Sequence, residues 1–260
     1  MKLKEINSLA NPVIKQIKSL KLKKYSKQHN LFLAEGYEYI TKAIKNGYTI
    51  KYLLFSQASD AELNAIIGSC EFLIKTTNAV LKELSQKNNP QPFLAAININ
   101  KKENQDTILP TSFDTAIALD NIRDAGNLGT IIRTCEAVGV KDIILIGDSV
   151  YPFSLDIVRA SAGSIFTVNI YNVTQDKFIN LMKQSYSIAT GFKDSVDFRD
   201  IDYTKANKII IMGNESNGIS SEIIQHSDII AQIPQQKGSN SLNLSIASAL
   251  MLYEAKKYIL

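Results

Sequence analysis

The sequence predicts an α/β protein built from two domains. Apolar runs of strand length alternate with helical periodicities along the whole 260-residue chain. The runs after residue 115 are longer and nearly continuous, which is typical of a parallel sheet covered on both faces. Residues 101–114 are polar, contain Pro110 and show no periodicity, so we place a linker there. The predicted domains are therefore residues 1–100 and residues 115–260.

The first predicted domain consists of short elements that alternate in type. Its first helix carries apolar residues such as Ile14 and Ile17 on one side and lysines on the other. Helices are predicted over residues 11–25, 36–46, 60–67 and 79–85, and strands over residues 31–34, 50–55, 71–74 and 93–99. This pattern indicates a small α/β domain.

The second predicted domain has longer strands, and helical stretches lie between most of them. Strands are predicted over residues 116–119, 142–146, 165–170, 186–190, 208–212 and 229–233, and a last helix over residues 246–259. Near-continuous apolar strands separated by helices favour a parallel sheet.

Composition narrows the class of protein. Hydrophobic residues make up 45% of the chain, and no apolar run approaches the ~18 residues of a membrane span. The first 20 residues hold four lysines and lack the apolar core of a secretory signal, so we expect a soluble cytoplasmic protein. Two cysteines and two histidines are too few and too scattered for a metal site of known spacing, and they also disfavour Cys–His nucleophilic catalysis.

The positive charge lies at the N-terminus. Residues 1–28 hold eight lysines and one acidic residue, Glu5, whereas the net charge of the whole chain is +4. A lysine-rich first helix is typical of contact with nucleic-acid phosphates. A solvated helix face is the alternative explanation.

Residues 116–140 contain the first candidate site. An apolar strand is followed by a polar turn and a helix, and ligands often bind at such a corner. Asn127 is the predicted N-cap, and Arg133 lies two turns into the helix. The two residues are about 240° apart around the helix axis, so we expect Asn127 to act from the turn and Arg133 from the helix body.

Two further stretches carry polar residues at strand ends. Gly213 and Glu215 follow the strand at 208–212, where Gly213 permits either a positive φ or the close approach of a ligand. Ser241 and Asn243 belong to a Ser- and Asn-rich entry into the last helix. Alone, these stretches equally fit an ordinary turn and a well-capped helix.

Together, the three stretches resemble, in order and spacing, the motifs of the SpoU-type RNA ribose 2′-O-methyltransferases. The resemblance rests on residues 121–133, on residues 213–215, and on residues 233–234 with 241–245. Residues 1–100, with Asn11-Pro12 and residues 32–36, look like the substrate-binding domain of that family, which is similar to ribosomal protein L30e. The resemblance implies an α/β fold in which a knotted (trefoil) parallel-sheet methyltransferase domain follows a small L30e-like domain, and it implies a homodimer.

The resemblance also implies roles for individual residues. Arg133 matches the essential arginine, which we expect to clamp the phosphate of the target nucleotide and to stabilise the developing alkoxide. Asn127, Glu215, Ser241 and Asn243 would complete the catalytic site. The cofactor would be S-adenosylmethionine, held by Gly213, Ile233, Leu242 and Thr190. RNA, with ribosomal RNA favoured over transfer RNA, would be bound by Arg159, Lys15, Lys18, Lys23 and Lys24, although Arg159 also fits an ordinary helix-surface arginine.

Departures from the family pattern leave alternatives open. Ala125, Ser216 and Gln235 stand where proline, glycine and methionine are usual, which puts local loop shape in doubt. A catalytically inactive RNA-binding protein of this fold and a transfer-RNA 2′-O-methyltransferase are the alternatives. A dinucleotide-dependent oxidoreductase is disfavoured, because Gly126-Asn-Leu-Gly129 lacks the Gly-x-Gly-x-x-Gly pattern.

Overall fold

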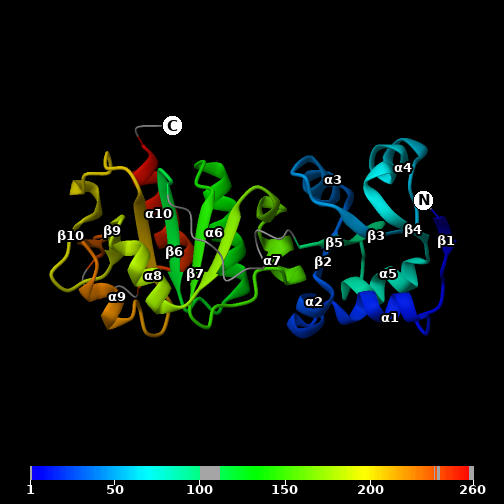
Figure 1. Ribbon diagram of the computed structural model, residues 1–260, viewed down its shortest axis with the longest axis horizontal. Coiled ribbons are helices and arrows are strands. Elements are labelled where there is room, and N and C mark those ends of the chain that lie inside the picture. Colours follow the sequence, from blue (N-terminus) through cyan, green and yellow to red (C-terminus); the bar gives the residue numbers. More distant parts are fainter. Residues whose placement is uncertain (1, 100–111, 237, 239–240, 258–260) are drawn as a thin grey trace. The chain divides into compact units, whose positions relative to one another are not determined.

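The chain forms two compact α/β units, shown in Figure 1. The computed structural model describes residues 2–99, 112–236, 238 and 241–257. The first unit comprises residues 1–100 and 151–166, and the second comprises residues 101–150 and 167–260. Most of the predicted linker, residues 101–111, lies outside the described residues. Unlike the predicted domains, the first unit includes a segment from the second half of the sequence.

The first unit is built on a five-stranded mixed sheet. Its strands, in spatial order, are β1 (Lys2–Glu5), β4 (Cys70–Lys75), β3 (Ile50–Phe55), β5 (Phe93–Asn98) and β2 (Leu31–Glu35). β5 runs antiparallel to both neighbours, and the other pairs are parallel. Its helices are α1 (Pro12–Ser19), α2 (Lys23–His29), α3 (Tyr37–Lys45), α4 (Asp60–Ile66), α5 (Asn78–Ser85) and α7 (Leu155–Ala160).

The predicted helix over residues 11–25 is wrong in one respect, because the structure has two helices there. α1 begins after Asn11, whose side chain accepts a hydrogen bond from the Val13 amide at 2.9 Å, and it ends at Ser19. Ile14 and Ile17 are buried in the core, but Leu22 is 60% exposed and has an extended backbone. The apolar face that favours a helix therefore stops at Leu20.

The second unit is built on a seven-stranded sheet in which every described pair is parallel, as predicted. Its strands, in spatial order, are β10 (Val196–Asp197), β12 (Ile229–Gln232), β9 (Tyr186–Thr190), β11 (Lys208–Gly213), β6 (Thr115–Asp120), β7 (Asp142–Ile146) and β8 (Asn169–Val173). Its helices are α6 (Ala125–Ala137), α8 (Gln175–Met182), α9 (Ser221–Gln225) and α10 (Leu244–Lys256). Along the described residues, no helix is both long and apolar enough to cross a bilayer.

Both faces of the parallel sheet are buried. Ala116 and Ala118 of β6 pack in one apolar cluster with Phe178 of α8, and the alternate residues Ile117 and Leu119 are also fully buried. Successive side chains of a strand point to opposite faces, so helices must cover both sides. α10 packs against α6 and against β11.

The predicted strand over residues 165–170 is wrong. The strand in this region is β8, at Asn169–Val173, whereas Ile165 and Phe166 form a short 3₁₀ turn in the first unit. Both residues are buried, so their apolar character reflects a core other than that of the parallel sheet.

An ion-pair cluster anchors α10 at the N-terminal end of the sheet. The Asp114 carboxylate lies 2.8 Å from Lys256 Nζ of α10 and 3.1 Å from Lys208 Nζ of β11. Partial burial opposes ionisation of Asp114, but hydrogen bonds from Lys256, Thr115 and Lys208 outweigh it and lower its pKa to about 2. These contacts fix the helix whose first turn contributes to the site described next.

Candidate functional site

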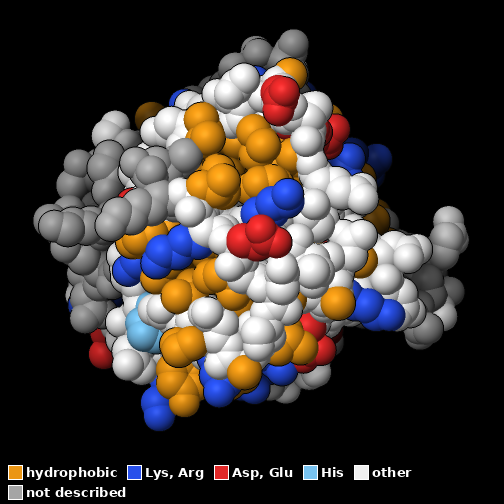
Figure 2. Space-filling model, turned by 90° about the vertical axis from the view of Figure 1, so that its right-hand side faces the viewer, with side chains coloured by type: hydrophobic (Ala, Val, Ile, Leu, Met, Phe, Trp, Pro, Cys, Tyr) orange, Lys and Arg blue, Asp and Glu red, His pale blue; other side chains and the backbone are white. Residues whose placement is uncertain are grey.

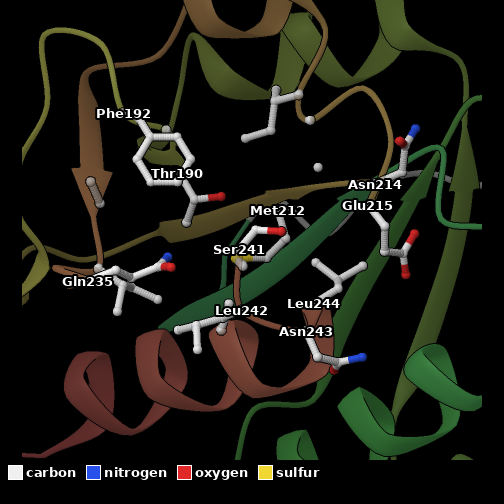
Figure 3. Close-up of a pocket in the computed structure, with 17 residues that line it drawn as sticks. Thr190, Phe192, Met212, Asn214, Glu215, Gln235, Ser241, Leu242, Asn243 and Leu244 are labelled. Atoms are coloured by element: carbon white, nitrogen blue, oxygen red, sulfur yellow. The ribbon is translucent and has the colours of Figure 1, made fainter. Parts of the chain in front are cut away.

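The second and third motif stretches line one cavity in the second unit, shown in Figure 3, and Asn127 of the first stretch is hydrogen-bonded to two of its lining residues, Glu215 and Asn243. The cavity volume of about 380 Å³ falls within the range of small-molecule sites. The cavity lies where β9, β11 and β12 end and where the chain enters α10, which is the edge at which open α/β sheets bind ligands. Seven residues predicted from the sequence line it: Thr190, Gly213, Glu215, Ile233, Ser241, Leu242 and Asn243.

A row of hydrogen bonds joins the motifs at the edge of this cavity. The Asn127 side-chain amide donates to Glu215 Oε1, and Asn127 Oδ1 accepts from Asn243 Nδ2 at 3.0 Å. Asn243 Oδ1 in turn accepts from the Ser245 amide at 2.9 Å and from the Ser245 hydroxyl at 2.6 Å. Every amide in the row therefore has a defined orientation, set at one end by a carboxylate that accepts and at the other by the start of α10.

Asn127 reaches this row from the first turn of α6. The predicted N-cap role of Asn127 is wrong, because Asp124 caps the helix and its Oδ1 accepts from the Asn127 amide at 2.6 Å. Aspartate is a strong N-cap, and it leaves the side chain of Asn127 available to Glu215 and Asn243. Asn243 is itself the N-cap of α10.

Sequence reasoning missed Asp120, a buried carboxylate at the end of β6. Asp120 Oδ2 accepts from the Ser220 amide and Asp120 Oδ1 accepts from Asn121 Nδ2, both at 2.7 Å. Asn121 has a positive φ of 53°, and its Oδ1 accepts from the Asp148 amide at 2.9 Å. Asp120 thereby ties the loop after Glu215 to the turn before α6. A carboxylate directly after a buried strand was the available signal.

Gly213 is required by a close approach of the chain to itself. A Cβ atom at this position would lie 2.0 Å from the Gly218 carbonyl carbon and 2.3 Å from the Ile219 nitrogen. The φ of Gly213 is not positive, so of the two reasons considered from the sequence only close approach applies, and the approaching group is backbone. Hydrogen bonds between Asn214 and Gly218 close the loop that carries Glu215.

We expect Gly213→Ala to damage the cofactor pocket, because the added methyl group would force apart the backbone at Gly218 and Ile219. The expected loss of stability is about 1–3 kcal/mol, and calorimetry should show markedly weaker binding of S-adenosylmethionine. Gly68→Ala is the matched control, since a Cβ there meets nothing within 4 Å. Unchanged cofactor affinity in Gly213→Ala would contradict the assignment of this loop to the pocket.

The two ends of the cavity differ in chemistry. In Figure 3, Thr190, Phe192 and Gln235 lie at one end, and Glu215 and Asn243 lie at the other. Phe192, which sequence reasoning missed, leaves 68% of its surface exposed although it lines the cavity. The Phe192 ring offers a face on which an adenine ring can stack, and Thr190 and Gln235 offer hydrogen-bonding groups beside it. Glu215 and Asn243 at the other end are exposed, so an RNA substrate has access to them. The residues present therefore fit S-adenosylmethionine.

Not every predicted residue joins the cavity. Arg133 is exposed on α6, is not among the lining residues and forms no side-chain hydrogen bond or ion pair with the described residues. Arg159 belongs to the first unit and pairs with Glu35. Lys15, Lys18, Lys23 and Lys24 are exposed on α1 and α2. Burial raises the pKa of the Cys135 thiol, which makes it a poor nucleophile.

Both halves of the sequence match known protein families. A family model described as the SpoU rRNA methylase family matches residues 114–253, and an MRM3-like substrate-binding domain matches residues 11–95. The 23S rRNA (guanosine(2553)-2′-O)-methyltransferase of Bacillus subtilis is 24% identical over 98% of this chain and all of its own. The tRNA (guanosine(18)-2′-O)-methyltransferase of Escherichia coli is 34% identical, but over 55% of this chain and 63% of its own.

Among solved structures, the AdoMet-bound rRNA methyltransferase of Sinorhizobium meliloti has a TM-score of 0.91 and 35% identity over 99% of each chain. This likeness bears out the predicted fold class, in which a knotted methyltransferase domain follows a small α/β domain in the sequence, and the predicted cofactor. It also bears out the predicted enzyme class, an RNA methyltransferase. Since the family model spans more than half of its residues, this chain belongs to the SpoU rRNA methylase family.

Proposed function

We propose that this chain transfers a methyl group from S-adenosylmethionine to the 2′-hydroxyl of a ribose in ribosomal RNA, in the cytoplasm. The observation that carries the proposal is the hydrogen-bonded row Glu215–Asn127–Asn243 at the edge of the cavity. These residues come from the three motifs, and an RNA-binding protein without activity has no need to join them. When bound, the cofactor supplies a methyl group on a positively charged sulfur.

The residues of the chain would position the nucleophile. Asn127 and Asn243, with their amides oriented by Glu215 and Ser245, would hold the target ribose by hydrogen bonds, and Ser241 would orient the adjoining loop. Arg133 would clamp the phosphate of the target nucleotide and stabilise the negative charge that develops on the 2′-oxygen. A guanidinium stays protonated, so the proton would pass to a phosphate oxygen or a neighbouring group. Precise approach geometry would then supply much of the acceleration.

Ribosomal RNA is favoured over transfer RNA by the first unit. The B. subtilis relative named for 23S rRNA matches this chain along its full length, whereas the E. coli relative named for transfer RNA matches about half of it. The first unit also matches a substrate-binding domain model. A transfer-RNA 2′-O-methyltransferase is the second candidate, because the E. coli relative has the higher identity of the two, 34% against 24%.

The lysines of α1 and α2 would contact RNA phosphates. Figure 2 views the side of the molecule that is on the right in Figure 1. Blue lysine and arginine side chains lie along its lower edge, at the level of α1 in Figure 1. Replacing Lys15, Lys18, Lys23 and Lys24 by glutamine should weaken RNA binding and reduce its salt dependence, by roughly one unit of slope for each phosphate that the variant no longer neutralises. Filter binding over a salt series measures this effect, and cofactor affinity should not change. An unaltered salt slope would contradict the proposed RNA surface.

A homodimer would cover the exposed face of α10. Ile246, Leu250 and Tyr253 lie along one side of this helix and are 52%, 40% and 52% exposed, while the opposite side packs in the core. We expect Leu250→Asp/Tyr253→Asp to be monomeric in sedimentation, because two carboxylates cannot be buried unpaired in an interface. Gln184→Glu, an exposed substitution on the same unit, is the control. A dimer that persists in the double variant would place the interface elsewhere.

Calorimetry with S-adenosylmethionine separates the proposed enzyme from an inactive RNA-binding protein. We expect stoichiometric heat of binding from the wild-type chain, and methylation of ribosomal RNA when cofactor and RNA are combined. A chain that binds RNA but gives no heat with the cofactor would be the inactive binder.

A further inference from the structure

The connection between two neighbouring strands of the methyltransferase sheet passes through the other unit. β7 and β8 pair in parallel, and such pairs are usually joined by a helix that packs on their own sheet. Here residues 151–166, which include α7, belong to the first unit instead. The chain therefore leaves the parallel sheet after β7 and returns to it at β8, so the two units share two covalent crossings besides the one near residue 100.

Aromatic side chains fix this segment within the first unit. Phe32 of β2 is fully buried, and its ring centroid lies 5.1 Å from that of Phe153 and 6.0 Å from that of Phe166. The Tyr151 hydroxyl lies 2.8 Å from the hydroxyl of Ser26, which is buried in the middle of α2. The segment is thus part of the core of the first unit.

Arg159 of this segment contacts the last residue of β2, Glu35, and the last residue of α5, Ser85. Glu35, the last residue of β2, has a side chain only 2% exposed. Arg159 Nη2 donates to Glu35 Oε2 at 2.5 Å and to the Ser85 carbonyl, at the end of α5, at 2.7 Å; Arg159 Nε donates to the same carboxylate oxygen at 3.1 Å. The Gln91 amide donates to Glu35 Oε1 at 3.0 Å. A second cation, Lys87 Nζ, stands farther away at 3.8 Å.

The geometry of this pair leaves the guanidinium of Arg159 little capacity for RNA. Its side chain is 19% exposed, and Nε and Nη2 donate to a buried carboxylate and to a helix-terminal carbonyl. The remaining nitrogen, Nη1, lies 3.7 Å from Asp156 Oδ1. A carboxylate this deeply buried needs its partner, because removing one member of a buried pair leaves an uncompensated charge. Arg159 is therefore placed to fix residues 151–166 in the first unit, and with them the two points at which the chain passes between the units.

We propose that Glu35 and Arg159 are a positioning pair that latches residues 151–166 into the first unit and so couples RNA capture by that unit to methyl transfer by the other. This inference rests on the proposed function. The latch makes the path of the chain between β7 and β8 depend on the integrity of the first unit. Weakening the ion pair should leave the binding of cofactor and the binding of RNA intact, and should lower the rate of methyl transfer.

The test compares Arg159→Ala, Glu35→Gln and the double variant with wild type. We expect Arg159→Ala to lower Tm by roughly 10 °C, because a buried carboxylate loses its partner. The double variant should recover part of this loss, since it removes the stranded charge. Arg199→Ala is the matched control, because that arginine is 61% exposed in an ion pair with Asp197. Arg159→Lys keeps the positive charge but loses the planar guanidinium with its paired N–H donors. It is a milder variant to use if Arg159→Ala folds poorly.

Activity measurements separate a latch from a phosphate contact. For a latch, Glu35→Gln and Arg159→Lys should each lower kcat on RNA, by up to roughly 10²-fold, through weaker positioning. Cofactor affinity should hold, and RNA affinity should stay within about twofold because lysines supply the phosphate contacts.

Overturning results are equally specific. If Glu35→Gln keeps full activity while Arg159→Lys or Arg159→Ala weakens RNA binding and lowers the salt slope, Arg159 is a phosphate contact and the latch is wrong. If the losses of stability in Arg159→Ala and Glu35→Gln add up to the loss in the double variant, the two residues are not coupled. These stability measurements need no methyl transfer, so a failure of the proposed function would not be mistaken for a failure of the latch.

Discussion

Replacing Arg133 by alanine is expected to reduce methyl transfer to RNA by roughly 10³-fold, to near the detection limit. Cofactor affinity should stay within several-fold of wild type, because Arg133 is not among the residues that line the cavity. The guanidinium would act on the phosphate of the target nucleotide and on the charge that develops on the 2′-oxygen, neither of which exists before RNA binds. Single-turnover methylation with labelled cofactor measures the chemical step.

Arg133→Lys and Arg199→Ala are the comparisons for this variant. Lysine keeps a positive charge but loses the planar fork, so we expect activity between wild type and alanine. Arg199 is exposed in the same unit and should be replaceable without loss of rate. If Arg133→Ala methylates RNA at a near-normal rate, the role assigned to Arg133 is wrong.

Asn127→Asp is expected to lower methyl transfer by roughly 10²-fold. The substitution preserves shape but turns the amide that donates to Glu215 into a carboxylate, so that two like charges face each other across the row. A carboxylate at this position can still accept from Asn243, so the expected loss comes from the contact with Glu215. Steady-state kinetics should show the loss mainly in kcat.

Asn180→Asp provides the matched control, because it makes the same chemical change at an exposed position of α8. We expect normal rates from this variant. Full activity in Asn127→Asp would mean that the hydrogen-bonded row does not position the substrate.

Most strands could be predicted because their apolar runs are bounded by polar residues on both sides. β7 (Asp142–Ile146) and β9 (Tyr186–Thr190) have the predicted limits. β1 was missed because Leu3 is its only apolar residue, and β10 because it has two residues. Residues 165–166 were misassigned because an apolar run does not reveal which core buries it.

The sequence indicated which residues line the cavity more fully than it indicated the contacts that those residues make. Gly213, Glu215 and Asn243 line one cavity, as the motif resemblance grouped them. Gly213 and Glu215 lie at a strand end and Asn243 at the start of α10, both at the edge where parallel sheets bind ligands. The pattern could not place Arg133 outside the cavity or supply Asp120, whose role depends on an amide a hundred residues away. Arg159 pairs with Glu35 for the same reason, because contacts between distant residues leave no local periodicity.

The decisive measurement is a map of ribose methylation in ribosomal RNA after incubation with the purified protein and S-adenosylmethionine, with Glu215→Ala and Arg133→Ala in parallel. We expect wild-type protein to add a methyl group to a defined ribose 2′-oxygen, and both variants to leave that ribose unmodified. Methylation of a base, or ribose methylation that persists in both variants, would contradict the site proposed here.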